Sequence, residues 1–288
     1  SNNMVKRIAE YRERYYKVLA GRESLVRLIN EAEVPEHVYN SNAIENSTLT
    51  LEETEKILNR VALDRYINER EIFEARNLAG VVGYISDKAS EKELDSEMIQ
   101  LLHRMLMANI DGTIAGRFRQ PGEYVRVGTH IAPPPEKVEE LIRTMLYEYK
   151  AVFDSVHIIK RLARLHLTFE HIHPFNDGNG RIGRVIVNYI LLREGYVPVN
   201  IKFVDRTRYY EAFREFDREA KTSVMEDILF KALTNSYHKR LAYLEGKKII
   251  NLGDYARKMK LSHSNLLNKA NRQTIEAFLE KGIWKIGT

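Results

Sequence analysis

The sequence HPFNDGNGRIGR occupies residues 173–184. It follows an apolar stripe at helical spacing that ends in Ile172, and the proline after His173 disfavours helical backbone at the histidine, so a helix is predicted to end there. The Asp-Gly and Asn-Gly pairs at 177–180 are turn dipeptides that permit positive φ, and a second apolar stripe predicts a new helix from about Arg181. The stretch therefore predicts two helices joined by a glycine-rich turn that exposes and positions a histidine.

This turn and the start of the second helix are predicted to bind an anion. Backbone N–H groups of such a turn and the free N–H groups of a helix's first residues face a common centre. Arg181 and Arg184 are three residues apart, so both lie on one helix face, where guanidinium groups can hold phosphate oxygens bidentately. Asp177 offers a hard oxygen ligand for Mg²⁺ shared with phosphates. His173 is suited to accept a proton from an attacking hydroxyl, which indicates phosphoryl or nucleotidyl transfer.

Other interpretations of these residues have to be considered. The three glycines satisfy G-x-G-x-x-G, but the preceding segment is predicted to be a helix rather than a strand, and the remaining kinase motifs and the Walker pattern are absent. A histidine-metal hydrolase could use His166, His171, His173 and Asp177, although H-E-x-x-H spacing is absent. A simple glycine-rich connector with solvated arginines is a further alternative.

Composition limits the class of protein. The chain has 288 residues, of which 44% are hydrophobic, so it can bury a core and form about two domains. It has no cysteine, which excludes disulfides, thiolate catalysis and cysteine-rich zinc sites. No apolar run is long enough to span a bilayer, and no secretory signal is evident. The net charge of +5 mildly favours anionic partners. We expect a globular, cytoplasmic protein without membrane association.

Apolar residues recur at helical spacing through most of the chain, which predicts a mainly α-helical fold. The helices expected before the central turn are 6–28, one capped by Thr50 with Glu53, 68–87 and 97–107. The exception is 116–135, where alternating residues between turn signals predict a short β-hairpin, followed by prolines that open the next helix.

The basic C-terminal segment differs in character from the rest of the chain. Residues 247–288 contain nine lysines and arginines against three acidic residues. Short amphipathic pieces at 254–259 and 262–270 predict a helix-turn-helix or winged-helix arrangement. DNA binding through phosphate contacts is one interpretation. A protein-interaction or packing module is favoured over it, because no stretch concentrates its basic residues on one evident recognition face.

The central turn resembles the motif of the Fic (filamentation induced by cAMP) family, H-x-F-x-[DE]-G-N-G-R-x-x-R. The fixed positions are all matched, by His173, Phe175, Asp177, Gly178, Asn179, Gly180, Arg181 and Arg184. The resemblance implies an all-helical Fic fold that binds Mg·ATP and transfers AMP to a hydroxyl of a target protein, with release of pyrophosphate. It implies that His173 deprotonates the acceptor hydroxyl and that Asp177 holds Mg²⁺. Phosphates would be bound by the turn at 178–180 with Arg181, and Arg184 would reach the γ-phosphate.

A second stretch, Ser41-Asn42-Ala43-Ile44-Glu45-Asn46, resembles the family's inhibitory motif [ST]-x-x-x-E-[GN]. On spacing alone, Asn42 three residues before Glu45 favours a helix start, and the presence of the core motif reverses that preference. The resemblance implies that Glu45 forms a salt bridge with Arg184 and occupies the place of the γ-phosphate. It therefore implies a ground state of low activity that Glu45→Gly would release.

Two looser resemblances extend the comparison. The hairpin at 116–135 resembles the family's flap, on which an extended target segment would dock, although an ordinary surface hairpin fits equally well. Tyr209 and Tyr210 lie in a stretch similar to the family's Tyr-x-x-Ala-Leu, with Phe213 in place of leucine. An adenine or ribose contact by either tyrosine is one interpretation, and buried helix aromatics are the other.

Together these features predict three regions: an N-terminal helical region with the inhibitory motif at 1–92, a Fic catalytic core at 93–246, and a small basic helix-turn-helix-like domain at 247–288. The leading hypothesis is an autoinhibited protein adenylyltransferase that can also modify itself. A Fic enzyme that transfers another nucleotide or removes AMP is an alternative. A DNA-binding regulator with a vestigial Fic core is another.

Overall fold

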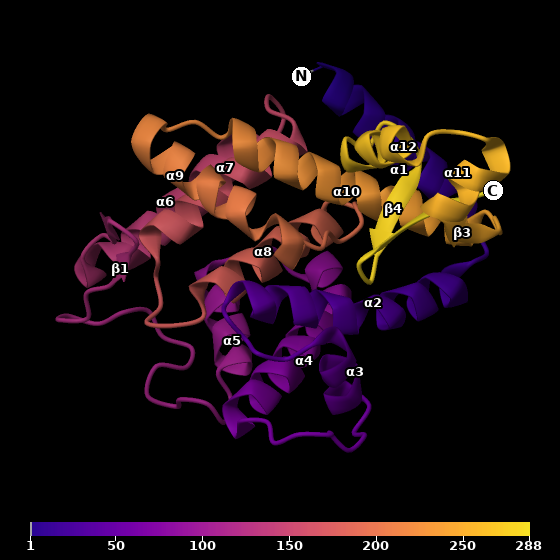
Figure 1. The fold of residues 1–288 in the computed structure, drawn as a ribbon. Helices are drawn as coiled ribbons and strands as arrows, with labels where there is room; N and C mark the ends of the chain where they lie inside the picture. The colour runs from indigo at the N-terminus through magenta and orange to yellow at the C-terminus, as the bar shows by residue number, and fades with distance from the viewer. Residues whose placement is uncertain (1) are drawn as a thin grey trace. The chain divides into compact units, whose positions relative to one another are not determined.

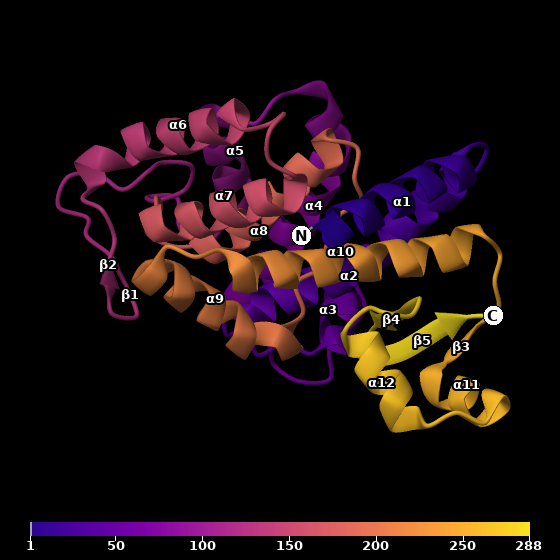
Figure 2. The same cartoon turned by 90° about the horizontal axis from the view of Figure 1, so that it is seen from above.

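The computed structural model describes residues 2–288, which form twelve α-helices, one 3-10 helix and five short strands (Figures 1 and 2). The predicted mainly helical fold with a small hairpin is confirmed. The chain divides into two compact units, one of residues 34–196 and 201–228, and one of the residues up to 33 with 197–200 and 229–288. Helices α2 (Glu23–Ile44) and α10 (Ser223–Leu244) contribute residues to both units.

The larger unit is built around one buried helix. That helix is α8 (Asn179–Arg193). Besides parts of α2 and α10, the unit contains α3 (Leu51–Leu58), α4 (Glu69–Glu91), α5 (Ser96–Leu106), α6 (Pro135–Ala151), α7 (Ile158–Ile172), η1 (Phe203–Asp205) and α9 (Arg206–Glu219). Residues all around α8 are buried, as expected of a helix at the centre of a core. It packs against α4, α5 and α7, and α7 in turn packs against α6 and α9. The turn between α7 and α8 therefore leads directly into a helix that is buried on all sides.

Local capping signals define most of the helix ends. Thr50 and Glu53 form the predicted capping box of α3, and Asn68 caps α4. The single helix expected at 6–28 is wrong, because α1 (Asn2–Leu19) and α2 are separate helices. Gly21 between them has a φ of +78°, a left-handed conformation that commonly ends a helix at glycine.

The predicted hairpin is present and is shorter than the sequence alternation indicated. Strands β1 (Arg126–Val127) and β2 (His130–Ile131) pair antiparallel, with Val127 opposite His130. Both Val127 and Ile131 are exposed, so the strands bury no apolar face that would extend the pairing. Pro135 begins α6, as expected.

The smaller unit contains the basic segment. Its elements are α1, β3 (Ile249–Asn251), α11 (Leu252–Met259), α12 (His263–Asn271), β4 (Ala277–Glu280) and β5 (Ile283–Gly287), besides its parts of α2 and α10. The strands form one antiparallel sheet in the order β3-β5-β4. Helices α11 and α12 pack together through Ala256 and Ala270, whose small side chains permit close approach. Two adjacent helices followed by a β-hairpin confirm the predicted winged-helix-like arrangement.

None of the helices within residues 2–288 combines the length and the hydropathy needed to cross a lipid bilayer.

Candidate active site

The histidine at the end of α7 is held in an unusual backbone conformation. His173 caps α7 with a φ of 50° and a ψ of 61°, so the predicted helix end is confirmed. A left-handed conformation is unfavourable for a residue with a Cβ and persists where its surroundings fix it. Arg119, which is only 3% exposed, supplies this restraint, since its Nε donates to the His173 carbonyl (2.8 Å) and its backbone N–H to the Pro174 carbonyl (2.9 Å). No local feature of the sequence indicates this partner, which is 54 residues away.

The His173 side chain is positioned as a neutral base. Burial lowers its pKa to about 4, so the imidazole is uncharged near pH 7. Its Nδ1 lies 3.3 Å from the backbone carbonyl oxygen of Glu170. Because a carbonyl oxygen only accepts, the proton sits on Nδ1 and the lone pair on Nε2. Nε2 is therefore the atom that can take a proton from another molecule.

A buried pair of stacked rings, His103 and Phe175, supports the turn between α7 and α8. Phe175 is fully buried and stacks on the ring of His103, with 3.8 Å between ring centroids and 2° between their planes. The Nδ1 atom of His103 accepts from the Gly116 N–H (3.0 Å), so its Nε2–H donates to the Asp177 carbonyl (2.8 Å). Burial lowers the pKa of His103 to about 4, so it stays neutral in this role. His103 was not predicted as a site residue, because nothing near it along the chain indicates this contact.

Asn179 closes the turn with its side chain. Its Oδ1 accepts from the Phe175 N–H (2.9 Å), and its Nδ2 donates to the Phe175 carbonyl (2.8 Å). The residue is 2% exposed, so both bonds are shielded from water. Asn179 was predicted as part of a phosphate-binding turn, and the structure gives its side chain a structural role within that turn.

Asn179→Ala is expected to destabilise the fold by about 2–4 kcal/mol, because each buried polar group left without a partner costs about 1–3 kcal/mol. The matched control is Asn176→Ala in the same turn, which removes one part-buried bond to Glu123 and should cost less than about 1.5 kcal/mol. Urea unfolding followed by circular dichroism measures both. Equal losses in the two variants would show that the Asn179 bonds do not hold the turn.

The start of α8 has the features of an anion cradle. Gly178 is the N-cap residue, with a φ of 84° and no side-chain cap bond. The first backbone N–H groups of α8 thus lack the usual capping acceptor and carry the positive end of the helix dipole. The Asp177 carboxylate lies beside them, accepts from the Gly178 N–H (2.8 Å) and forms an ion pair with Arg70 (2.6 Å).

The two arginines of the motif have different partners. Arg181 is buried and forms an ion pair with Glu74 on α4, at 2.7 Å. Arg184 is also buried and pairs with Glu45, where NH2 and Oε1 are 2.9 Å apart. Their ion-pair partners here are different carboxylates, and binding of one anion by both arginines stays a prediction. Arg70 and Glu74 were not found from the sequence.

Glu45 fills the cradle in front of α8. Ser41–Ile44 form the last turn of α2, so the alternative that this stretch starts a helix is wrong. A Cβ atom placed on Gly180 would lie only 2.0 Å from Glu45 Oε1, so the carboxylate rests directly against the backbone of the first turn of α8. A helix N-terminus favours a negative charge at this position. A carboxylate therefore occupies the space in which the sequence predicts a phosphate.

Arg184 forms hydrogen bonds with two further residues, Ser41 and Tyr209. Its Nε donates to Ser41 Oγ (2.9 Å), its NH2 to the Ser41 carbonyl (2.9 Å), and its NH1 lies 3.4 Å from the Tyr209 hydroxyl. Burial opposes its charge, but Tyr209 and Glu45 raise the pKa of Arg184 above its ordinary value. The guanidinium is therefore charged, and its hydrogen bonds and ion pair to residues 41–45 hold it in this position.

Behind the histidine lies a buried carboxyl group that sequence analysis did not assign to the site. Burial, together with the nearby Glu45 charge, raises the pKa of Glu170 to about 8. Its Oε2 lies 4.0 Å from His173 Nδ1, and its Oε1 has no hydrogen-bond partner within residues 2–288. Gly183 on α8 makes room for it, since a Cβ there would lie 2.8 Å from Glu170 Oε1. The only signal in the sequence was its place three residues before His173.

The two tyrosines lie on the α9 side of the site. Tyr209 is buried, and its hydroxyl lies 2.6 Å from His166 Nε2. Tyr210 donates to the Ile44 carbonyl at 2.9 Å. An adenine or ribose contact by either one stays a prediction. Within the described residues, the ligand set suggested for a hydrolase is not assembled, because His166 bonds to Tyr209 and the possible metal-binding group contains His171 without His173 or Asp177.

Comparison with known proteins gives consistent results. Residues 93–191 match the family model of the Fic/DOC family. The chain is 33% identical over 217 residues to a protein adenylyltransferase Fic from Nematostella vectensis, a match that covers 72% of this chain and 49% of that protein. The chain thus spans about half the length of this relative.

Solved structures share the fold. A Fic-domain-containing signaling protein from Bacteroides thetaiotaomicron has a TM-score of 0.75 at 23% identity, over 84% of this chain and 97% of that one. A Fic family protein from Desulfovibrio desulfuricans has a TM-score of 0.67 at 24% identity, over 99% of this chain and 95% of that one. At these identities the likeness concerns the fold alone.

Proposed function

Because residues 93–191 form a domain of the Fic/DOC family, we propose that this chain is a protein adenylyltransferase, which moves AMP from Mg·ATP to a hydroxyl side chain of a target protein. The observation that carries the proposal is the pairing of a neutral, tautomer-fixed His173 with an anion cradle at the start of α8. In this proposal residues 93–246 catalyse and residues 1–92 regulate.

His173 acts as the general base. Its Nε2 accepts the proton of the acceptor hydroxyl while the hydroxyl oxygen attacks the α-phosphorus, and pyrophosphate leaves. A pKa of about 4 would make it a weak base, but the negative charge of a bound polyphosphate raises the pKa of a neighbouring imidazole toward neutrality. Arg119 and the Glu170 carbonyl keep the ring and its backbone in position during the transfer.

Phosphates are bound by the first N–H groups of α8 with Arg184, and Asp177 would hold Mg²⁺. The Asp177 carboxylate suits this ion, since Mg²⁺ in nucleotide sites typically takes one or two protein carboxylates besides phosphate oxygens. Its partner Arg70 is half-exposed, and an exposed ion pair contributes little, so a metal can replace it. When bound, Mg²⁺ offsets the negative charge that develops on the phosphates.

We also propose that the protein is autoinhibited. The Glu45 carboxylate lies against Gly180 and pairs with Arg184, and these are the groups that would receive the γ-phosphate. ATP can adopt the productive pose only after this carboxylate leaves. Autoinhibition is supported by this geometry together with the inhibitory motif at 41–46.

The hairpin is the proposed docking place for the target. Its strands are two residues long, and all their residues but the part-buried His130 are exposed, so an extended segment could add to their edge. Self-modification is proposed as a second outcome of the same chemistry. The proposed compartment is the cytoplasm, which agrees with the lack of cysteine in the sequence.

The test uses intact-protein mass spectrometry of Glu45→Gly after incubation with Mg²⁺ and each of the four ribonucleoside triphosphates. A mass increase by one AMP group with ATP, and no increase with the other three nucleotides, supports the proposal. A mass increase with another nucleotide would identify that nucleotide, and not ATP, as the substrate. Loss of AMP from previously modified protein, with no gain from ATP, would instead favour a hydrolase that removes AMP.

DNA binding is a second candidate function for residues 247–288. Asn265, Asn268 and Lys269 lie on one exposed face of α12, and the exposed C-cap residue Arg272 continues it; this face was not predicted from the sequence. Asparagine, lysine and arginine are suited to contacts with bases and phosphates in the major groove. This shared face supports DNA binding as a candidate role for the segment.

Lys269→Glu with Arg272→Glu is expected to weaken duplex binding by at least about tenfold at low salt, because phosphate contacts supply most non-specific affinity. Fluorescence anisotropy at several salt concentrations measures this. Lys6→Glu with Lys17→Glu, two exposed residues of α1, is the control matched in charge. If the wild type shows no salt-dependent binding, or if both variants bind alike, α12 is not a DNA-reading helix.

A further inference from the structure

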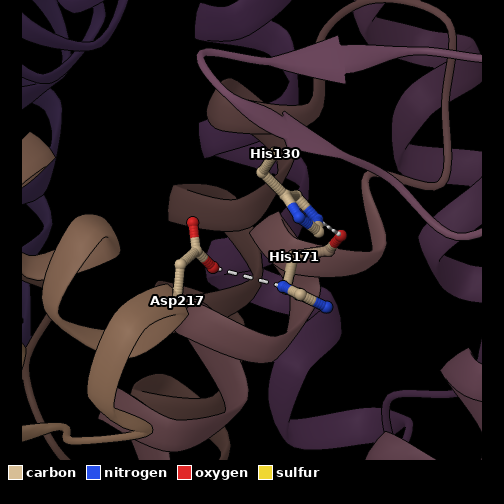
Figure 3. Close-up of side chains that lie close together, drawn as sticks. All are labelled: His130, His171 and Asp217. Atoms are coloured by element: carbon tan, nitrogen blue, oxygen red, sulfur yellow. Dashed lines mark hydrogen bonds and ion pairs between the residues drawn. The ribbon is translucent and has the colours of Figure 1, made fainter.

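Three side chains with metal-binding atoms meet beside the hairpin. His130 comes from β2, His171 from the last turn of α7 and Asp217 from α9 (Figure 3). One ligand atom from each lies within 4.8 Å of the other two. The His130 and His171 rings stack with 4.0 Å between centroids. Elements far apart in the sequence thus bring two imidazoles and one carboxylate together.

The hydrogen bonds of the cluster prepare it for a cation. His130 Nε2 lies 3.0 Å from the His171 backbone oxygen, which can only accept, so His130 carries its proton there and keeps a lone pair on Nδ1. Metal-bound histidines typically donate their second ring N–H to a carbonyl or carboxylate in this way. His171 Nδ1 lies 3.2 Å from Asp217 Oδ1, where a metal ion could replace the shared proton.

We propose that His130, His171 and Asp217 bind one divalent transition-metal ion, such as Zn²⁺, that fastens the hairpin to α7 and α9. Two imidazoles and one carboxylate with an open position for water form a common Zn²⁺ ligand set. Ligand atoms around tetrahedral zinc lie closer together than 4.8 Å, so small side-chain rotations are required. Partly exposed side chains can make them, and Asp217 is exposed.

The consequence is mechanical. His171 lies two residues before His173, so the metal would fix the hairpin next to the candidate base. This site uses none of the residues proposed for phosphate or Mg²⁺ binding, so it does not depend on the AMP-transfer proposal. If that proposal also holds, metal would set the position of the docking hairpin.

The test is calorimetric titration of Zn²⁺ into the full chain, freed of metal with a chelator and carrying no histidine tag. We expect one site, and at least about tenfold weaker binding in His130→Ala, His171→Ala and Asp217→Asn, since even the outer partners of metal ligands matter by about 10–100-fold. His263→Ala, an exposed histidine on α12, should bind as the wild type does. Thermal melting without metal checks that every variant folds.

Hydrogen exchange gives a second measurement that is independent of catalysis. Zn²⁺ should slow amide exchange across residues 126–131 in the wild type and leave it unchanged in His130→Ala. Zinc binding that survives all three substitutions, or that is lost equally in His263→Ala, would overturn the site. Binding without protection of the hairpin would overturn the fastening role.

Discussion

Glu45→Gly is expected to raise the initial rate of AMP incorporation by at least about tenfold over wild type, which corresponds to about 1.4 kcal/mol. The substitution removes the carboxylate that rests against Gly180 and frees Arg184 for the γ-phosphate. A charge pair at a largely buried arginine competes strongly with an incoming ligand, so its removal should have a large effect. Self-modification with α-labelled ATP provides the rate while the target is unidentified.

Asn46→Gly is the matched control for this experiment. Asn46 is the next residue and already has a φ of 70°, so glycine fits its backbone while the Glu45 carboxylate stays in place. It should leave the rate near that of wild type. Equal activation by both variants would mean that loosening the chain after α2, rather than removing the carboxylate, releases the enzyme.

His173→Ala in the Glu45→Gly background is expected to lower the transfer rate by at least about 100-fold, because general-base catalysis typically contributes about 10²–10⁴-fold. ATP binding should change little, since the phosphate cradle belongs to α8 and Arg184. Rate and ATP affinity are measured on the same preparation, the affinity by calorimetry. A rate that persists within a few-fold of Glu45→Gly would remove His173 from the chemistry.

A parallel loss of ATP affinity and rate would have another meaning. It would indicate that the alanine disturbs the turn, whose backbone is tied to Arg119 through the His173 carbonyl. His173→Asn, which keeps a polar side chain at the same left-handed position, separates these outcomes, because asparagine tolerates that conformation. It should bind ATP and remain inactive.

The central turn was predictable because its determinants are local. Proline after His173 ends a helix, glycines permit left-handed backbone, and apolar periodicity defines both flanking helices. The structure confirms that α7 ends at Ile172, and α8 begins at Asn179, two residues before the predicted start at about Arg181. The capping box of α3 was recognisable for the same reason.

The residues that hold the turn were not predictable, because they come from distant segments. Arg119 and His103 contact its backbone from 54 and 74 residues away. No spacing rule connects such positions within a single sequence. The same holds for Arg70 and Glu74, which pair with motif residues across the helical core.

One mistaken expectation, the single helix at 6–28, and one rejected alternative, the helix start at 42–45, arose from ambiguous local signals. Gly21 inside an apolar periodic stretch is compatible with a continuous helix or a break, and only its left-handed conformation decides. Asn42 with Glu45 has the spacing of a helix start, yet the segment ends α2, and the partner of Glu45 is Arg184. In both places the local sequence allowed two structures, and only the folded chain shows which one forms.

The most direct test of AMP transfer is paired labelling of Glu45→Gly with ATP labelled on the α-phosphate in one reaction and on the γ-phosphate in the other. Adenylyl transfer should leave α-label on protein and none of the γ-label, which departs with pyrophosphate. Protein carrying γ-label would indicate phosphoryl transfer. The absence of both labels from protein that binds Mg·ATP, alone and with cell lysate as acceptor, would contradict the proposed enzyme activity.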